Sequence, residues 1–387
     1  MDPQVNKKTL TLCMIVKDEA DVILRALHSV SSFVDHICIC DTGSTDGTQR
    51  IIEAYLKKFN LSGKVFERPW KNFGHNRTEC FNLAKETFKD SEYLMTLDAD
   101  EIIMAWDGQP KHDQRVVSIP PLEGDMMYVK TVYSSCHYYR GTFFKASLDW
   151  KWEGVLHEYP HAEETHRVVI MDKLCNFPTQ DGARSKVENK YLLDAEVFEK
   201  ELKEHPEDSR SWFYLAQSYF DGEKPELAIV PLEKCIEHTA WWEEEFIARL
   251  RKARYKRQAG FSFEDVMAEY LVTYDKFPTR MEPLFDIISY YRSTEQYQSA
   301  ALFLQAALSI SYPKECILFV EEALYHWHLQ DEASIVYHKI GNSEVALSIA
   351  SLIIDKPQVP PQAVERIKRN METFKKAIDQ KKEFKEG

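Results

Sequence analysis

The N-terminal part of the chain alternates short apolar runs with helical patterns, and this alternation most restricts the fold. The apolar runs at 10–16 and 36–40 are almost continuous, which is typical of strands buried on both faces of a sheet. Residues 19–33, 49–59 and 76–88 instead show helical spacing of their apolar side chains. This βαβα order predicts an α/β, Rossmann-like domain with a mostly parallel sheet and helices on both faces.

The predicted strands end in acidic residues. Glu19 and Asp41 follow the first two strands, and the run 94–101 carries an apolar strand into Asp98 and Asp100. Alternate residues of a strand share a face, so these two aspartates are predicted to point the same way. Ligands of such sheets bind at the carboxyl ends of strands, and paired carboxylates suit a hard divalent cation. The pattern predicts a metal-dependent enzyme acting on a nucleotide diphosphate compound.

Four segments resemble family 2 glycosyltransferases of the GT-A fold. They are residues 15–19, 40–48, 70–77 and 97–101, which have the order and spacing of the family motifs within the first 185 residues. The resemblance implies a hexosyltransferase-like enzyme that moves a sugar from a nucleotide-sugar donor, foremost a UDP-sugar, with inversion at the anomeric carbon. It also implies a hydroxyl acceptor on a glycan or a protein.

The resemblance further implies roles for individual residues. Asp41 is expected to contact the base, Asp98 the ribose or the metal, and Arg77 the nucleotide or phosphate region. Asp100 is expected to bind a Mn²⁺ or Mg²⁺ ion that bridges to the diphosphate. The complete set expected to contact the donor is Val16, Glu19, Asp41, Arg77, Asp98 and Arg184.

The segment 148–158 gathers tryptophans, acids and a histidine. Its Trp-x-Gly-x-x-His-Glu pattern resembles a segment that closes the active site in relatives of this family. His157 is expected to complete the metal shell with the two aspartates or to lie beside the phosphates, and the alternative is an ordinary structural histidine. An acceptor hydroxyl also needs a general base. The candidates are Glu158, Glu101 and Glu153.

The loop 180–186 carries Gly182, Arg184 and Lys186. It is expected either to fold over the donor phosphates, because guanidinium groups bind phosphate bidentately, or to be an interdomain linker.

Beyond about residue 190 the strand pattern stops and helices dominate. Residues 212–219 and 283–292, each followed by a second helix, resemble tetratricopeptide (TPR) helix pairs. We therefore expect three regions: a GT-A domain at 1–185, a TPR-like helical repeat domain at 186–355, and a charged C-terminal helix or tail at 356–387. The helical array is expected either to bind a partner, including a second copy of the chain, or to brace the catalytic domain.

The composition of the chain restricts the kinds of partner that we expect and the location of the protein. The net charge of −13 argues against nucleic acid as a partner. No 18-residue apolar run is present for a membrane span, and the eight cysteines form no paired framework. These features lead us to expect a cytoplasmic protein.

Two other functions remain open at this point. A nucleotidyl or phosphoryl transferase also needs acidic metal ligands, but the sequence has no Gly-x-x-x-x-Gly-Lys phosphate loop. A helical-repeat adaptor with an inactive GT-A domain is the alternative outside enzymes. Donor hydrolysis that is lost on Asp100→Ala would favour the glycosyltransferase.

Overall fold

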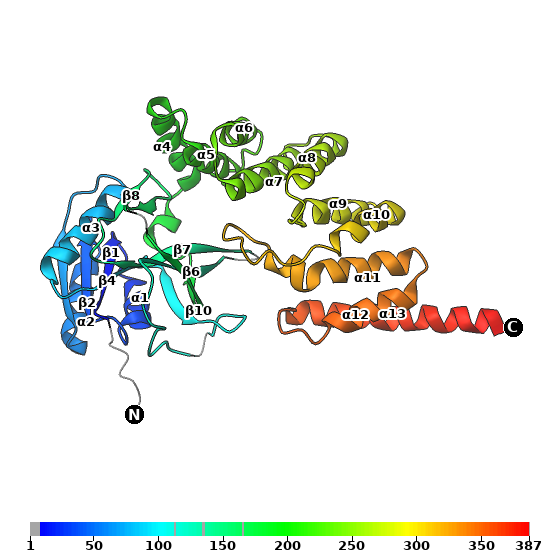
Figure 1. Ribbon diagram of the computed structural model, residues 1–387, viewed down its shortest axis with the longest axis horizontal. Helices are drawn as coiled ribbons and strands as arrows, with labels where there is room; N and C mark the ends of the chain where they lie inside the picture. Colours follow the sequence, from blue (N-terminus) through cyan, green and yellow to red (C-terminus); the bar gives the residue numbers. More distant parts are fainter. Residues whose placement is uncertain (1–7, 112–113, 134–135, 165, 387) are drawn as a thin grey trace. The chain divides into compact units, whose positions relative to one another are not determined.

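The computed structural model describes residues 8–111, 114–133, 136–164 and 166–386 (Figure 1). The chain divides into two compact units, Met1–Glu223 and Lys224–Gly387. The predicted boundary at residue 185 does not coincide with this division, because the first two long helices after the sheet belong to the first unit.

In the described part of the first unit, an eight-stranded sheet has the order β3-β2-β1-β4-β7-β6-β10-β5. Strands β3, β2, β1 and β4 are mutually parallel, as the βαβα pattern predicts, and β6 is parallel to β10. The pairs β4–β7, β7–β6 and β10–β5 are antiparallel. The strands are β1 (Leu10–Val16), β2 (His36–Asp41), β3 (Ser62–Glu67), β4 (Tyr93–Thr96), β5 (Glu101–Ala105), β6 (Met126–Tyr133), β7 (Cys136–Lys145) and β10 (Val168–Pro178).

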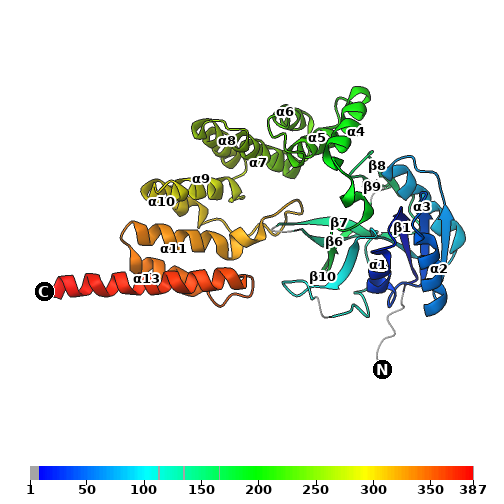
Figure 2. The ribbon, with the colours of Figure 1, turned by 180° about the vertical axis from the view of Figure 1, so that it is seen from behind.

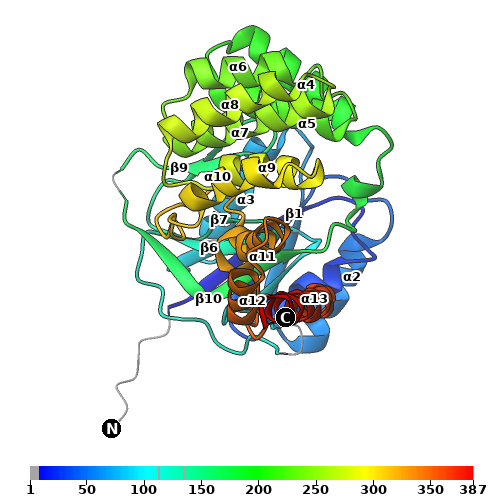
Figure 3. The same cartoon turned by 90° about the vertical axis from the view of Figure 1, so that its right-hand side faces the viewer.

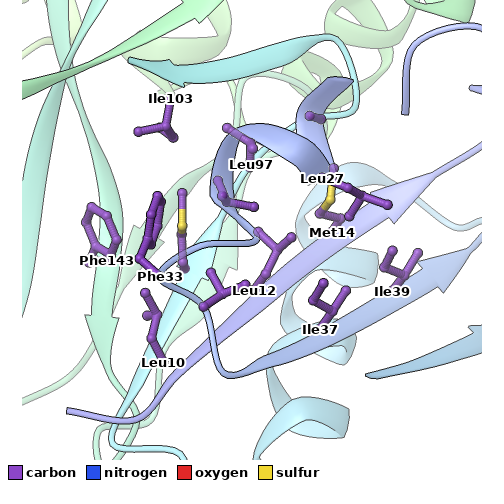
Figure 4. Close-up of a cluster of buried hydrophobic side chains, with 14 of the residues drawn as sticks. Leu10, Leu12, Met14, Leu27, Phe33, Ile37, Ile39, Leu97, Ile103 and Phe143 are labelled. Carbon is purple, nitrogen blue, oxygen red and sulfur yellow. The ribbon is translucent and has the colours of Figure 1, made fainter. Parts of the chain in front are cut away.

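Both faces of β1 are buried. Leu10, Leu12 and Met14 lie in the core between the sheet and the helices α1 and α2 (Figure 4). Cys13 and the half-buried Ile15 pack on the opposite face, with side chains of α3. This two-sided burial explains why the strand reads as a continuous apolar run.

Six helical segments belong to the first unit. Figures 1 and 2 show α2 and α3 on opposite sides of β1 and β2. A small hairpin, β8 (Lys151–Glu153) with β9 (Tyr159–His161), contributes Trp152 to the core under α3. The helices are α1 (Ile23–Val30), α2 (Thr48–Phe59), α3 (Phe73–Thr87), the 3₁₀ turn η1 (Ala183–Lys186), α4 (Lys190–Glu204) and α5 (Ser209–Asp221).

The second unit is a series of packed helices, as predicted. Its pair α9–α10 corresponds to the predicted pair that begins at residue 283, whereas the predicted helix 212–219 is α5 of the first unit. The pairs α7–α8, α9–α10 and α11–α12 each pack together, and α13 packs on α12, as Figure 3 shows for α12 and α13 seen nearly end-on. The helices are α6 (Ile229–His238), α7 (Trp242–Gln258), α8 (Phe263–Lys276), α9 (Glu282–Ser293), α10 (Tyr297–Ala307), a π-helical turn η2 (Leu324–His328), α11 (Leu329–Lys339), α12 (Ser343–Ile353) and α13 (Pro361–Glu386).

A buried ion pair lies inside this array. Arg280 and Glu282 are both fully buried, and Arg280 Nη2 lies 2.7 Å from Glu282 Oε1. The Tyr325 hydroxyl donates to the same carboxylate at 2.7 Å.

Two further properties concern the environment of the chain. The seven cysteines whose side chains the structure describes are buried, and none of them forms a disulfide. Within the described residues, every helix is too short or too polar to cross a membrane.

Candidate active site

The carboxyl ends of β1 and β2 meet at one edge of the sheet. Val16 pairs in register with Asp41, and the Val16 carbonyl accepts hydrogen bonds from the Thr42 amide and hydroxyl at 2.9 and 3.1 Å. Asp41 Oδ1 accepts hydrogen bonds from the amides of Gly43 and Ser44, at 2.9 and 2.8 Å. Asp41 Oδ2 is buried without a hydrogen-bond partner in the described structure. A buried acceptor of this kind suits a ligand donor group.

The loops that follow β1 and β2 hold each other. The Asp18 amide donates to Ser44 Oγ at 2.9 Å, and the Glu19 amide donates to Thr48 Oγ1 at 2.8 Å. Gly47 has a φ of +96°, a conformation that glycine adopts without strain. This interlocking fixes Glu19 beside the strand ends.

The two aspartates lie in a turn rather than in a strand. β4 ends at Thr96, and the Glu101 amide donates to the Asp98 carbonyl at 3.1 Å before β5 begins. The prediction that Asp98 and Asp100 point the same way by strand alternation is therefore wrong in its premise, because a turn has no two-residue period. The two carboxylates have different neighbours.

Arg77 of α3 engages three groups. Its Nη2 donates to Asp98 Oδ1 at 2.6 Å, its Nη1 donates to Thr96 Oγ1 at 3.2 Å, and its Nε donates to Glu158. Its side chain is only 10% exposed. Burial lowers the pKa of Arg77, but Asp98 and Glu158 outweigh burial and raise it above its usual range.

Arg140 of β7 extends this network from the other side. Its Nη2 donates to Glu101 Oε2 at 2.5 Å, and its Nη1 lies 3.5 Å from Asp98 Oδ2. Burial raises the pKa of Asp98, but Arg77 and Arg140 outweigh burial and hold that pKa below its ordinary value. We call the set the arginine–carboxylate chain, comprising Glu158, Arg77, Asp98, Arg140 and Glu101.

Asp100 is not part of the arginine–carboxylate chain. Within the described residues no ion pair joins its side chain, and its pKa is raised by burial and by the nearby Asp98 and Glu101. Glu19 is similar: burial, with Asp100 and Asp98, raises its pKa to about 7, although the Ala183 amide donates to its Oε2 at 3.1 Å. Two carboxylates whose charged forms are disfavoured suit a bound cation.

A strap formed by residues 179–186 covers Asp100. The Thr179 amide and hydroxyl donate to the Asp100 carbonyl at 2.8 and 2.6 Å. Arg25 of α1 donates to Asp181 at 2.6 Å, and this contact, with Thr179, lowers the pKa of Asp181 to about 2. A Cβ on Gly182 would lie 3.0 Å from Asp100 Oδ2, so the strap can approach this closely because residue 182 has no side chain.

Arg184 and His157 contact residues other than the expected phosphate and metal ligands. Arg184 donates to Asp194 of α4, and its guanidinium lies 4.9 Å from the Phe73 ring centroid. The His157 ring stacks on Tyr214 of α5, with 4.0 Å between centroids. In the described part of the chain no three His, Cys, Asp or Glu side chains are gathered to hold a metal, so the expected trio of Asp98, Asp100 and His157 is not brought together.

Each of the three candidate bases accepts a hydrogen bond from another side chain. Glu158 accepts from Arg77, Glu101 accepts from Arg140 and from the Asp98 amide, and Glu153 accepts from the Tyr159 hydroxyl at 2.6 Å. Sequence reasoning missed Arg140. The available signal was a lone arginine in the aromatic run 138–144 of a strand.

Comparisons with known proteins show what the chain is similar to. Residues 11–105 match the profile of Glycosyl transferase family 2. The chain is 26% identical over 238 residues to the SPbeta prophage-derived glycosyltransferase SunS of Bacillus subtilis, covering 59% of this chain and 53% of SunS. It is 34% identical over 100 residues to a TPR repeat-containing protein of Synechococcus elongatus, covering 25% of this chain and 22% of that one.

One solved structure aligns with about half of the chain. The C-terminal part of a TPR repeat-containing protein of Cytophaga hutchinsonii aligns with a TM-score of 0.36 and 15% identity, over 48% of this chain and 68% of that one. The chain spans about a fifth to a half of the curated relatives described above. By the family match, residues 11–105 lie in a family 2 glycosyltransferase domain.

Proposed function

We propose that this chain, through its family 2 glycosyltransferase domain, transfers a sugar from a nucleotide diphosphate donor to a hydroxyl of a glycan or a protein. A UDP-sugar is the donor that we favour, and inversion is the expected stereochemical course. The observation that carries the proposal is the pair Asp100 and Glu19 near the strand ends: both carboxyl groups have raised pKa values, and neither forms an ion pair among the described residues.

The donor nucleotide would lie along the edge that Val16 and Asp41 form. The unpartnered Asp41 Oδ2 supports this placement, because a nucleobase N–H would satisfy it. The strap residues 179–186 would then border the diphosphate side of the site, where the Ala183 amide already donates to Glu19.

A Mn²⁺ or Mg²⁺ ion fits Asp100 better than it fits Asp98. Asp98 already has two guanidinium partners, whereas Asp100 has none in the described structure, so Asp100 would hold the ion together with phosphate oxygens and Glu19 would lie close by. When bound, such an ion supplies Lewis-acid stabilisation of the departing diphosphate. The arginine–carboxylate chain keeps Arg77 and Arg140 positioned beside this charge.

Acceptor deprotonation remains with Glu158, Glu101 or Glu153. Because each now has a partner, the acceptor would have to displace that partner before the carboxylate could take a proton. Glu158→Gln is expected to bind donor normally and to lose transfer, and unchanged turnover would remove Glu158 from this role.

The decisive experiment measures hydrolysis of a donor panel, with UDP-glucose, UDP-N-acetylglucosamine, GDP-mannose and dTDP-rhamnose, in the presence of Mn²⁺. We expect one donor to be hydrolysed and the activity to be lost in Asp100→Ala. Thermal stabilisation by the matching nucleoside diphosphate with Mn²⁺ is the binding control.

The alternative is an adaptor with an inactive domain. The observation that favours it is the occupation of Asp98 by Arg77 and Arg140. Failure of UDP, GDP and dTDP to stabilise the chain, together with no hydrolysis of any donor, would support the adaptor and overturn the enzyme.

A further inference from the structure

Residues 154–158 form a tight turn that is held from two sides. Gly154 and His157 both adopt positive φ, at +102° and +51°, and side-chain-bearing residues such as histidine seldom take this conformation. On one side the turn meets α3, where a Cβ on Gly74 would lie 2.6 Å from the Trp152 carbonyl oxygen and 2.8 Å from that of Gly154. The other side of the turn meets α5.

Arg210, near the start of α5, makes the second attachment. Its Nε and Nη2 both donate to the His157 carbonyl, at 3.0 and 2.8 Å. Its guanidinium also lies 5.2 Å from the Tyr159 ring centroid and 5.0 Å from that of Tyr214, on which the His157 ring stacks. A planar group that donates twice to one oxygen fixes both the position and the orientation of that peptide.

The residue after this peptide is Glu158. Its side chain is only 8% exposed and accepts a hydrogen bond from Arg77, which in turn donates to Asp98. The direction in which the Glu158 side chain leaves the backbone depends on the left-handed conformation of His157. The contacts therefore run from α5, through one peptide, into the arginine–carboxylate chain.

We propose that Arg210 is a positioning residue for the reaction: by holding the His157 peptide from α5, it holds Glu158 on Arg77. The catalytic part of this role rests on the proposed glycosyl transfer. Arg210 touches no reacting atom itself, so its loss should slow turnover without weakening donor binding.

Three variants separate this role from a purely structural one. Arg210→Met keeps the aliphatic stem near the two tyrosines and removes both donors, whereas Arg210→Lys keeps the charge and a donor. Tyr219→Phe is the matched control, because it removes the hydrogen bond between Tyr219 of α5 and Glu199 of α4 without touching the turn.

Hydrogen exchange of the full-length variants tests the positioning without any substrate. Arg210→Met should raise amide exchange in residues 155–159 at least tenfold, Arg210→Lys should raise it less, and Tyr219→Phe should leave it unchanged. Wild-type exchange of this segment in Arg210→Met would overturn the proposal, as would an equal rise in Tyr219→Phe.

Donor hydrolysis tests the consequence for the reaction. Arg210→Met should lower kcat about tenfold with KM for the hydrolysed UDP-sugar within twofold of wild type, and Arg210→Lys should recover part of the loss. A kcat of Arg210→Met within twofold of wild type would overturn the positioning role.

The two proposals fail in different ways. A wild-type chain that hydrolyses none of the four donors contradicts the proposed function, and the exchange measurement then decides whether Arg210 holds the turn. An active wild-type chain with an equally active Arg210→Met variant contradicts the positioning role and leaves the proposed function standing.

Discussion

Buried charges occur in both units of this chain, but they are balanced differently. In the second unit, Arg280 is paired with Glu282, and the fully buried Asp331 side chain lies 2.6 Å from Arg366. In the first unit the arginine–carboxylate chain is balanced in the same way, yet Asp100 and Glu19 lie beside it with raised pKa values. Ion pairing alone therefore does not mark a functional site, and the proposed site rests instead on the raised pKa values of Asp100 and Glu19.

The largest expected effect is a loss of stability when the buried pair of Arg280 and Glu282 is broken. Arg280→Met should leave Glu282 buried without its cation and lower the free energy of unfolding of the second unit by about 3–5 kcal/mol. Urea unfolding followed by circular dichroism measures this loss. The double variant R280M/E282Q should recover most of it, because no unpaired charge then remains. A loss below about 1 kcal/mol would mean that this pair is not the structural element described here.

The next largest effect is expected at Asp100 in the first unit, on activity and not on stability. Asp100→Asn should reduce donor hydrolysis at least 100-fold, equivalent to about 2.7 kcal/mol of transition-state stabilisation, without lowering the melting temperature. Asp98→Asn is the matched comparison, because it removes the partner of both Arg77 and Arg140 and should lower the melting temperature. If Asp100→Asn destabilised the fold as much as Asp98→Asn, the distinction between the two aspartates would be lost.

A smaller effect is expected from the strap. Gly182→Val places a side chain where Cβ alone would lie 3.0 Å from Asp100 Oδ2, so the carboxylate or the strap must move. We expect about a tenfold fall in kcat for donor hydrolysis, or about 1.4 kcal/mol. Lys234→Gln is the control, since its ion pair with Glu237 on α6 is exposed and contributes little. Equal activity of the two variants would show that Gly182 does not position Asp100.

The smallest effect is a pH dependence. The pKa of Glu19 is raised to about 7 from an ordinary value near 4.5, so the folded chain binds the proton more tightly than the unfolded chain does. Stability should therefore fall as the pH rises from about 4.5 to about 7. Glu19→Gln should match wild type at pH 4 and exceed it at pH 8 by about 1 kcal/mol, after allowance for a half-buried group. Unfolding measured across this range without metal or nucleotide tests the sign.

The parallel half of the sheet could be predicted because its signals are local. The apolar run 10–16 and the helical spacing that follows it appear within a few residues of each other, and they correspond to β1 and α1. Strands β6, β7 and β10 were not assigned from the sequence. Their order, with β7 inserted between β4 and β6, depends on pairings between distant segments, which local periodicity does not encode.

The sequence could place those candidate site residues whose position depends only on where a strand ends. Asp41 lies at a strand end because β2 ends there. The separate environments of Asp98 and Asp100 could not be foreseen, because they depend on Arg140 from β7 and on Gly182 from the strap. His157 likewise depends on Tyr214, which lies 57 positions further along the chain in a helix that the sequence assigned to another domain.

The extent of the first unit bears on how the chain can be divided. A fragment that stops at residue 185 would lose Tyr214 and Arg210, and the turn at His157 would then have to stand without its outer support. A fragment that continues to residue 223 keeps both attachments. The position after α5 is therefore the junction at which the helices of the second unit can be exchanged while both attachments of the turn at His157 are kept.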